Sequence, residues 1–253
     1  MKDLKSIDDV IDVLEHIITT SIEKGDALGY FAALYQKVTI KVKDGINNGA
    51  FENPERMEKL DIVFARRYLD AYFAYQKNEP VTDSWKAAFD LSSKYWPIVL
   101  QHILIGMNAH ISLDLGIAAA EISRGQDIIT LQKDFNKIND ILSELVNEVQ
   151  ENLAKIWPNL HSILKKFGSV DDFMVDFSMK LARNGAWDFA LKMAKSQSDP
   201  SPSIKSRDQD IASKTNLIIP RKFIIRLILA IVRIGERGSV AERISILRPI
   251  SSE

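Results

Sequence analysis

The residues with the clearest potential for chemistry lie together in one apolar stretch, from about Pro97 to Glu121. A helix that is apolar almost all round is expected to lie inside a protein rather than on its surface. Buried polar groups cost free energy unless they are hydrogen-bonded or bind something. The stretch nevertheless carries five polar side chains, those of His102, Asn108, His110, Ser112 and Asp114. Either the rest of the chain or a ligand must supply their partners.

His110 and Asp114 are the pair best suited to chemistry. They are four residues apart, so in a helix they share one face, a single turn from each other. An imidazole oriented by a carboxylate can act as a general acid or base, and the pair could also ligate a metal ion. His102 lies about 80° around the helix from His110 and roughly 12 Å along its axis. The alternative is that both side chains are satisfied core residues that tie helices together.

Two arginines, Arg67 and Arg183, lie on apolar stripes of expected helices. A buried arginine needs a carboxylate partner or binds an anionic ligand. One interpretation is an ion pair with Asp114 or Asp176. The other is a clamp that holds the carboxylate or phosphate group of a ligand.

The candidate site residues fall into two groups. The group with a catalytic role comprises His110, Asp114 and Tyr68, although a tyrosine at helical spacing is more often a core residue. The group that would contact a substrate comprises His102, Arg67, Asn108, Arg183 and Trp187. No metal ligands are predicted, because the chain has four histidines and neither an HExxH motif nor the ExxH pairs of di-iron bundles. The sequence indicates no particular cofactor.

Hydrophobic periodicity predicts helices along most of the chain. Ser6 followed by Asp9 resembles a capping box, and Gly25 is expected to end the first helix. Pro158 should kink or restart the longest helix. Alternation at 38–43 leaves a short strand as an alternative there. The other helices are expected at about 26–44, 55–76, 84–95, 97–124, 127–167, 169–195, 216–235 and 240–247.

The last third of the chain contains a segment of different composition. Residues from about 196 to 215 are rich in Ser, Asp, Lys and Pro and contain almost no apolar residues, which predicts a flexible loop. The helix expected after it, at about 216–235, is predicted to be buried, with Arg226 and Arg233 on a basic exposed edge. A helix at a membrane surface is the alternative. Its apolar run is too short for stable membrane insertion.

Composition and motifs exclude several classes of protein. The 253 residues include 33 Lys and Arg against 34 Asp and Glu, and this balance argues against a general nucleic-acid binder. The absence of cysteine excludes a disulfide scaffold, a thiolate nucleophile and a cysteine-ligated zinc site. The acidic, amphipathic N-terminus is unlike a secretory signal, so a cytoplasmic location is expected. The chain lacks the motifs GxSxG, GxxxxGK[ST] and GxGxxG. The sequence therefore does not support a hydrolase with a nucleophile elbow, a P-loop protein or a Rossmann dinucleotide-binding protein.

Four stretches resemble a bacterial family catalogued as a domain of unknown function. They are FAALYQKVT, LDIVFARRYLDAY, MNAHISLDL and DFSMKLARNGAW, and the similarity spans roughly residues 26–190. In that family the central segment typically reads N-A-H-I-N-x-D-L and the earlier helix F-A-N-R-Y-L-D-A. The chain departs at Ser112 and Arg66, where the family usually has Asn. The motif positions filled here are Asn108, His110, Asp114, Arg67, Tyr68 and Asp70.

These observations predict an all-α, single-domain multi-helix bundle, spanning residues 1–253, with a buried central helix. The first functional hypothesis is an intracellular enzyme that acts on a small organic molecule in an inter-helix pocket, with a His/Asp acid–base pair. The second is a non-catalytic protein that binds a lipid-like or carboxylate ligand in the same pocket. The third is a structural or oligomer-forming module whose polar core only fixes helix register. The expected partner is a small-molecule ligand, and a homo-oligomer is possible.

Overall fold

The computed structural model describes residues 4–158, 179–196 and 198–249. Every regular element in these ranges is helical, which confirms the predicted all-α fold. In chain order the elements are α1 (Ile7–Lys24), α2 (Gly29–Asn47), α3 (Pro54–Gln76), α4 (Asp83–Asp90), α5 (Val99–Ala109), η1 (His110–Asp114), α6 (Leu115–Ile122), η2 (Ile128–Leu131), α7 (Gln132–Ile156), α10 (Met179–Lys195), α11 (Ser201–Ser213), α12 (Thr215–Ile218), α13 (Phe223–Gly235) and α14 (Val240–Leu247).

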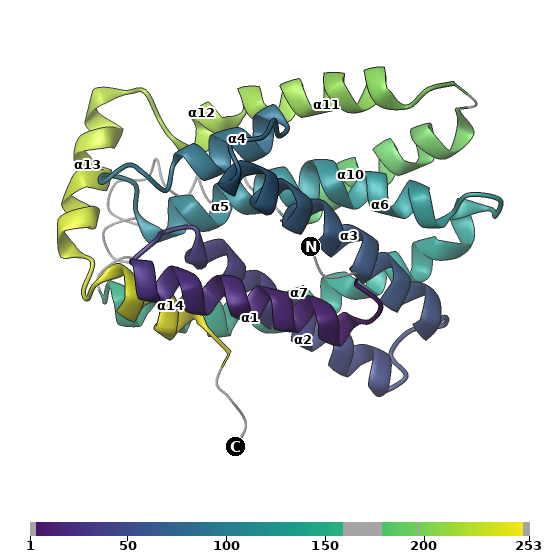
Figure 1. The fold of residues 1–253 in the computed structure, drawn as a ribbon, viewed down its shortest axis with the longest axis horizontal. Coiled ribbons are helices and arrows are strands. Elements are labelled where there is room, and N and C mark those ends of the chain that lie inside the picture. The colour runs from purple at the N-terminus through teal and green to yellow at the C-terminus, as the bar shows by residue number, and fades with distance from the viewer. Residues whose placement is uncertain (1–3, 159–178, 197, 250–253) are drawn as a thin grey trace.

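The central helix consists of α5, η1 and α6, which follow one another without a break from Val99 to Ile122. It is long and apolar enough to cross a membrane, but 89% of its most apolar window is buried inside the protein. It is therefore the core helix of the bundle, as predicted. Figure 1 shows α11 along one long edge of the molecule, α1 and α14 along the opposite edge, and α13 across one end.

Two glycines let other helices approach this central helix closely. A Cβ on Gly106 would lie 2.6 Å from ring carbons of Phe31 in α2, and a Cβ on Gly116 would lie 2.6 Å from the carbonyl oxygen of Ala186 in α10. Either contact would be a clash, so the two positions favour glycine. The space is taken by neighbouring helices rather than by a ligand.

The helix ends follow local signals in the sequence. Ser6 and Asp9 form the predicted capping box at the start of α1, and Gly25 ends that helix with a φ of +62°. The helix α7 ends at Ile156, close before Pro158, because the residues before a proline disfavour helical geometry. The predicted continuation to residue 167 and most of the start of the next helix lie outside the described residues.

The prediction of a flexible loop at about 196–215 is wrong, because Ser201–Ser213 forms the helix α11. A proline in the first helical turn favours this start. Asp208 is buried, and its carboxylate accepts hydrogen bonds from the backbone N–H groups of Asp83 (2.7 Å) and Ser84 (2.9 Å), at the start of α4. Ile211 is buried as well. Long-range contacts therefore order a segment whose composition resembles a loop.

The prediction that 216–235 forms one buried helix is also wrong. The segment splits into α12 and α13 around Pro220, and one face of α13 is exposed. Its buried side chains are those of Ile228, Leu229 and Val232. Periodicity identified the helix correctly, but the helix is apolar on two faces and the structure covers one of them.

Candidate functional site

The site is built around the turn η1, His110–Asp114, in the middle of the central helix. This turn is a π-helix, in which the N–H of Leu115 bonds to the carbonyl of His110, five residues earlier. Single π turns inside α-helices occur frequently at functional sites. The turn keeps the predicted pair together, with His110 Nδ1 3.2 Å from Asp114 Oδ2. Both side chains are almost completely buried.

Asp114 has a protein partner on each carboxylate oxygen. Its Oδ1 accepts a hydrogen bond from Nε of Arg67 at 2.8 Å, in an ion pair between α3 and η1. Its Oδ2 accepts one from Nε1 of Trp85 at 2.8 Å and faces His110. One of the two interpretations offered for Arg67, the ion pair with Asp114, is thus the one observed. Asp114 positions its neighbours and is not open to a ligand.

His110 has one nitrogen paired and one unpaired. Because the Asp114 carboxylate only accepts hydrogen bonds, the proton of a neutral His110 is placed on Nδ1, which then donates to Oδ2. Nε2 is buried and has no hydrogen-bond partner in the described part of the chain. Burial lowers the pKa of His110, although the neighbouring Asp114 opposes this shift. The imidazole is therefore neutral near pH 7, and Nε2 presents a lone pair.

Aromatic rings hold the imidazole in place. The ring of Phe64 in α3 stacks on it, with centroids 3.6 Å apart and planes within 5° of parallel. Tyr35 and Phe31, both from α2, meet it edge-on at centroid distances of 4.5 Å and 5.8 Å. These three rings fix the orientation of the imidazole, and therefore the direction in which its Nε2 points.

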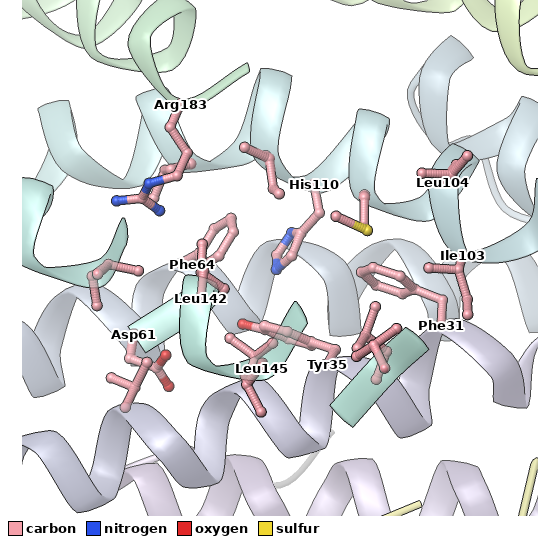
Figure 2. Close-up of a pocket in the computed structure, with 18 of the residues that line it drawn as sticks. Phe31, Tyr35, Asp61, Phe64, Ile103, Leu104, His110, Leu142, Leu145 and Arg183 are labelled. Atoms are coloured by element: carbon pink, nitrogen blue, oxygen red, sulfur yellow. The ribbon is translucent and has the colours of Figure 1, made fainter. Parts of the chain in front are cut away.

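A pocket of about 300 Å³ lies beside His110, between α2, α3, α5, α7 and the start of α10. Figure 2 shows the imidazole reaching into it between Phe64 and Phe31, with Tyr35 below. The lining is almost entirely apolar, and includes Leu34, Leu100, Leu104, Leu145, Val149 and Leu153. The polar side chains in the lining are His110, Tyr35, Asp61, Gln150 and Arg183.

Tyr35 and Asp61 bring two more unpaired polar atoms to this pocket. Among the described residues, the hydroxyl of Tyr35 and Oδ2 of Asp61 are buried without a hydrogen-bond partner in good geometry. The hydroxyl of Thr39 donates to the Tyr35 backbone carbonyl, at 2.9 Å. Burial, with a contribution from Glu58, raises the pKa of Asp61 to about 7. Burial also raises the pKa of Tyr35 well above its usual value, and Asp61 and Asp114 add to this shift.

Arg183 is the one predicted arginine that reaches the pocket lining. Its Nε donates to Oδ1 of Asn139 at 2.7 Å and its Nη2 to the carbonyl of Phe135 at 2.5 Å. No ion pair joins it to a carboxylate among the described residues, and its predicted partner Asp176 lies outside them. Burial lowers its pKa to about 10, so it keeps its charge near neutrality. In Figure 2, Arg183 and Asp61 lie toward the same end of the pocket, opposite Ile103 and Leu104.

Tyr68 and Trp187 do not line the pocket. Tyr68 is fully buried next to Trp85 and Phe31, with ring centroids 5.1 Å and 5.0 Å away. Burial raises its pKa well above the usual value, so it keeps its proton. Trp187 packs against Phe135, and its indole N–H is buried without a hydrogen-bond partner in the described ranges. The predicted roles of Tyr68 in catalysis and of Trp187 in substrate binding therefore have no support from the lining of this pocket.

His102 and Asn108 face other surroundings. His102 lies against the ring of Tyr30, and burial, helped by Arg233, lowers its pKa to about 3. Asn108 donates a hydrogen bond to the carbonyl of Ile211 at 3.3 Å, which ties the central helix to α11. The structure therefore brings together His110, Asp114, Arg67 and Arg183 around one site, and places His102 and Asn108 elsewhere.

Three residues of the site were not singled out from the sequence, namely Tyr35, Asp61 and Trp85. Asp61 carried a usable signal, since it lies one and two turns before Ala65 and Tyr68 on the buried stripe of α3. A charged residue on such a stripe needs a partner or a function. No comparable signal linked Trp85 to Asp114. Among the described residues, no group of three or more His, Cys, Asp or Glu side chains could hold a metal ion.

Comparison with known proteins leaves the activity open and identifies the family. Neither the curated proteins nor the solved structures contain a match to this chain. A family model does match, over residues 7–221, and this range contains every residue that lines the pocket. The chain therefore belongs to DUF5995, a family of unknown function.

Proposed function

We propose that this protein binds a small, mostly apolar molecule in the inter-helix pocket, with the polar end of that molecule next to His110. The observation that carries the proposal is that three of the residues lining one apolar pocket each carry a buried polar atom with no hydrogen-bond partner among the described residues. These atoms are Nε2 of His110, the hydroxyl of Tyr35 and Oδ2 of Asp61. An unpaired buried polar group costs about 1 to 3 kcal/mol, so three in one place favour a ligand that pairs them.

The size and lining of the pocket support a lipid-like ligand. Its volume of about 300 Å³ would hold roughly ten atoms of the size of a methylene group, at the roughly 30 Å³ that a water molecule occupies in the liquid. Ligand sites usually combine such an apolar lining with a few placed polar groups. Arg183 and Asp61 lie toward one end of the pocket and Leu104 toward the other, with His110 and Tyr35 between them, and this asymmetry favours an amphipathic molecule.

Catalysis is the second candidate, and one observation favours it. His110 is neutral, oriented by Asp114, and offers an unpaired lone pair, as a general base must. Nε2 is, however, shielded from solvent, and a base that acts on bulk water would need access to it. Binding is therefore the better-supported function. An enzyme would use His110 as a base rather than as an acid, because burial lowers its pKa.

A blocked pocket tests the proposal. Leu145 lines the pocket from α7, and Leu145→Trp should fill part of it. Asn136→Trp is the matched control, because it places the same side chain on the exposed side of α7. In calorimetric titration, 1-decanol should bind one-to-one to the wild type and to the control, and at least tenfold more weakly to Leu145→Trp. Equal binding to all three, or none to the wild type, would refute the proposal.

A further inference from the structure

We infer that the polar end of the ligand is a hydroxyl group rather than a carboxylate, an inference that rests on the proposed function. The ligand class is then a long-chain or otherwise apolar alcohol. The argument follows from which atoms around the pocket can donate a hydrogen bond and which can accept one.

The first requirement is a donor on the ligand. Arg67 and Trp85 donate to Asp114, and the Nδ1–H of His110 faces the same carboxylate at 3.2 Å. With its proton on Nδ1, a neutral imidazole can only accept at Nε2. A ligand atom that pairs with Nε2 must therefore carry a hydrogen, as an alcohol does. A carboxylate or an ether carries none.

The second requirement is an acceptor on the ligand. The hydroxyl of Tyr35 keeps its proton and has no hydrogen-bond partner in good geometry among the described residues, so it can donate. Its ring meets the imidazole edge-on, with centroids 4.5 Å apart, so the two groups serve neighbouring positions. A hydroxyl oxygen both donates and accepts. One such group could pair with His110 and Tyr35 together.

Two charged side chains bear on the choice between an alcohol and an acid. Asp61 would repel a carboxylate whenever it is ionised, and its Oδ2 has no hydrogen-bond partner among the described residues. Arg183 would attract a carboxylate, but two of its nitrogens already donate, to Asn139 and Phe135. The unpaired atoms thus favour an uncharged head group. Arg183 alone favours a carboxylate, so tight binding of a carboxylate is the competing outcome.

Three ligands of nearly equal length separate these outcomes in the wild-type protein. They are 1-decanol, 1-methoxynonane, which accepts but cannot donate, and decanoate. At pH 7.5 we expect 1-decanol to bind about tenfold more tightly than either of the others, because each of them leaves Nε2 of His110 unpaired. Equal affinity for the ether, or tighter binding of decanoate, would overturn the inference and leave the pocket itself as a binding site. Failure of all three to bind would instead refute the proposed function.

Tyr35→Phe gives a second readout that does not depend on His110. The variant removes an unpaired hydroxyl and should keep the fold. It should weaken 1-decanol and 1-methoxynonane by similar factors and leave their ratio unchanged, because both can accept from Tyr35. Nitrogen-15 spectra of the imidazole should show the proton on Nδ1 in the free protein, and the Nε2 signal should move upfield when 1-decanol binds. A proton on Nε2 would contradict the reasoning.

A second inference comes from α13 and is independent of the pocket. We propose that the outer face of α13 binds the surface of an anionic membrane. Five large apolar side chains lie on this face, and each is 52–77% exposed: Phe223, Ile224, Leu227, Ile231 and Ile234. At 100° per residue they fall within a sector of about 100°, opposite the buried Ile228, Leu229 and Val232. Solvent-facing apolar patches of this kind mark interaction sites.

The charges around this face identify the partner. From Arg221 to Arg237 the chain has five basic residues and one acidic residue, Glu236, which is paired with Arg233 at 3.0 Å and Arg243 at 3.1 Å. Exposed cations, including Lys222 and Arg226, therefore flank the apolar face without local compensation. An apolar face with basic flanks is typical of helices that lie in the surface of an anionic bilayer.

Two exposed aromatic residues extend the same face. Tyr95 and Trp96 are 68% and 57% exposed, in the segment between α4 and α5. Arg233 of α13 donates to the Tyr95 carbonyl at 2.8 Å and lies over its ring, so this segment adjoins the helix. Figure 1 shows α13 at one end of the molecule, next to this segment. Tyrosine and tryptophan are enriched at membrane–water interfaces.

Vesicle sedimentation tests this surface. Wild-type protein should bind phosphatidylglycerol vesicles, and should bind phosphatidylcholine vesicles at least tenfold more weakly, with the difference falling as salt is added. The double variant Ile224→Ser/Ile231→Ser should lose at least tenfold in affinity, whereas Ile129→Ser, at an exposed isoleucine of η2, should not. Absent or unaltered binding would overturn the proposal. A dimer that the double variant dissociates would show that a second copy covers this face.

Discussion

Asp61 should make the protein less stable as the pH rises toward neutrality, and Asp61→Asn should remove this effect. Burial raises the pKa of this carboxyl group from 3.8 to about 7 in the folded protein. Below pH 3.8 the group is protonated whether the chain is folded or unfolded. Between these two values the unfolded chain loses the proton and the folded chain keeps it, so stability falls as the pH rises. Above about pH 7 the carboxyl group is ionised in both states, and stability falls no further.

The size of this effect follows from the shift of about 3 pKa units. At about 1.4 kcal/mol per unit, the ionisable carboxyl lowers the free energy of unfolding by about 4 kcal/mol at pH 8 relative to a group that does not titrate. Asn has nearly the same shape as Asp and stays neutral. Asp61→Asn should therefore be more stable than the wild type by up to this amount at pH 8, and by little at pH 4.5.

Urea unfolding followed by circular dichroism between pH 4.5 and 8.5 measures the difference. The control is Asp44→Asn, which changes an exposed carboxylate on α2 and should give a curve parallel to that of the wild type. If the difference in free energy of unfolding between wild type and Asp61→Asn stays constant with pH, the pKa of Asp61 is the same in the folded and unfolded protein. That result would refute the reasoning from burial, and with it one of the three unpaired atoms of the site.

Three further changes test the surrounding structure. Asp114→Asn removes the charge that pairs with Arg67 and should lower the free energy of unfolding by about 3 kcal/mol in urea titration; a loss under 1 kcal/mol would contradict a buried ion pair. Gly106→Ala should cost roughly 1 to 3 kcal/mol, because its Cβ would meet Phe31 at 2.6 Å, and an unchanged melting temperature would show that the ring moves freely. Ser239→Ala removes the cap of α14 and should cost about 1 kcal/mol by the same assay.

Much of the fold could be predicted because its determinants are local. The cap at Ser6 and the stop at Gly25 depend on a few neighbouring residues, and both were found in the expected place. Pro158 was expected to kink or restart the long helix, and α7 ends just before it. The central helix was recognisable because an almost wholly apolar helix of that length must be covered by others. The pairing of His110 with Asp114 also followed from spacing alone.

The rest depends on contacts between distant segments. Whether Asp61 meets a cation, water or an apolar wall is decided by α7, more than 70 residues away in the chain. Polar composition suggested a loop at 196–215, but Asp208 and Ile211 gain partners on other helices that make α11 stable. For α13 the pattern defined two apolar faces, and no property of the sequence determines which one the protein covers.

The wide turn at His110–Asp114 is the one place where the length of the central helix can change by a residue without turning its faces. A π turn accommodates one residue more than an α-helical turn, so deleting a residue here would restore regular α-helical geometry and leave α6 in nearly its present orientation. Gly116 would still lie against Ala186 of α10. Deleting a residue from α5 would instead rotate everything after it by about 100° about the helix axis. Among relatives, a one-residue difference in the length of this helix should therefore fall at this turn.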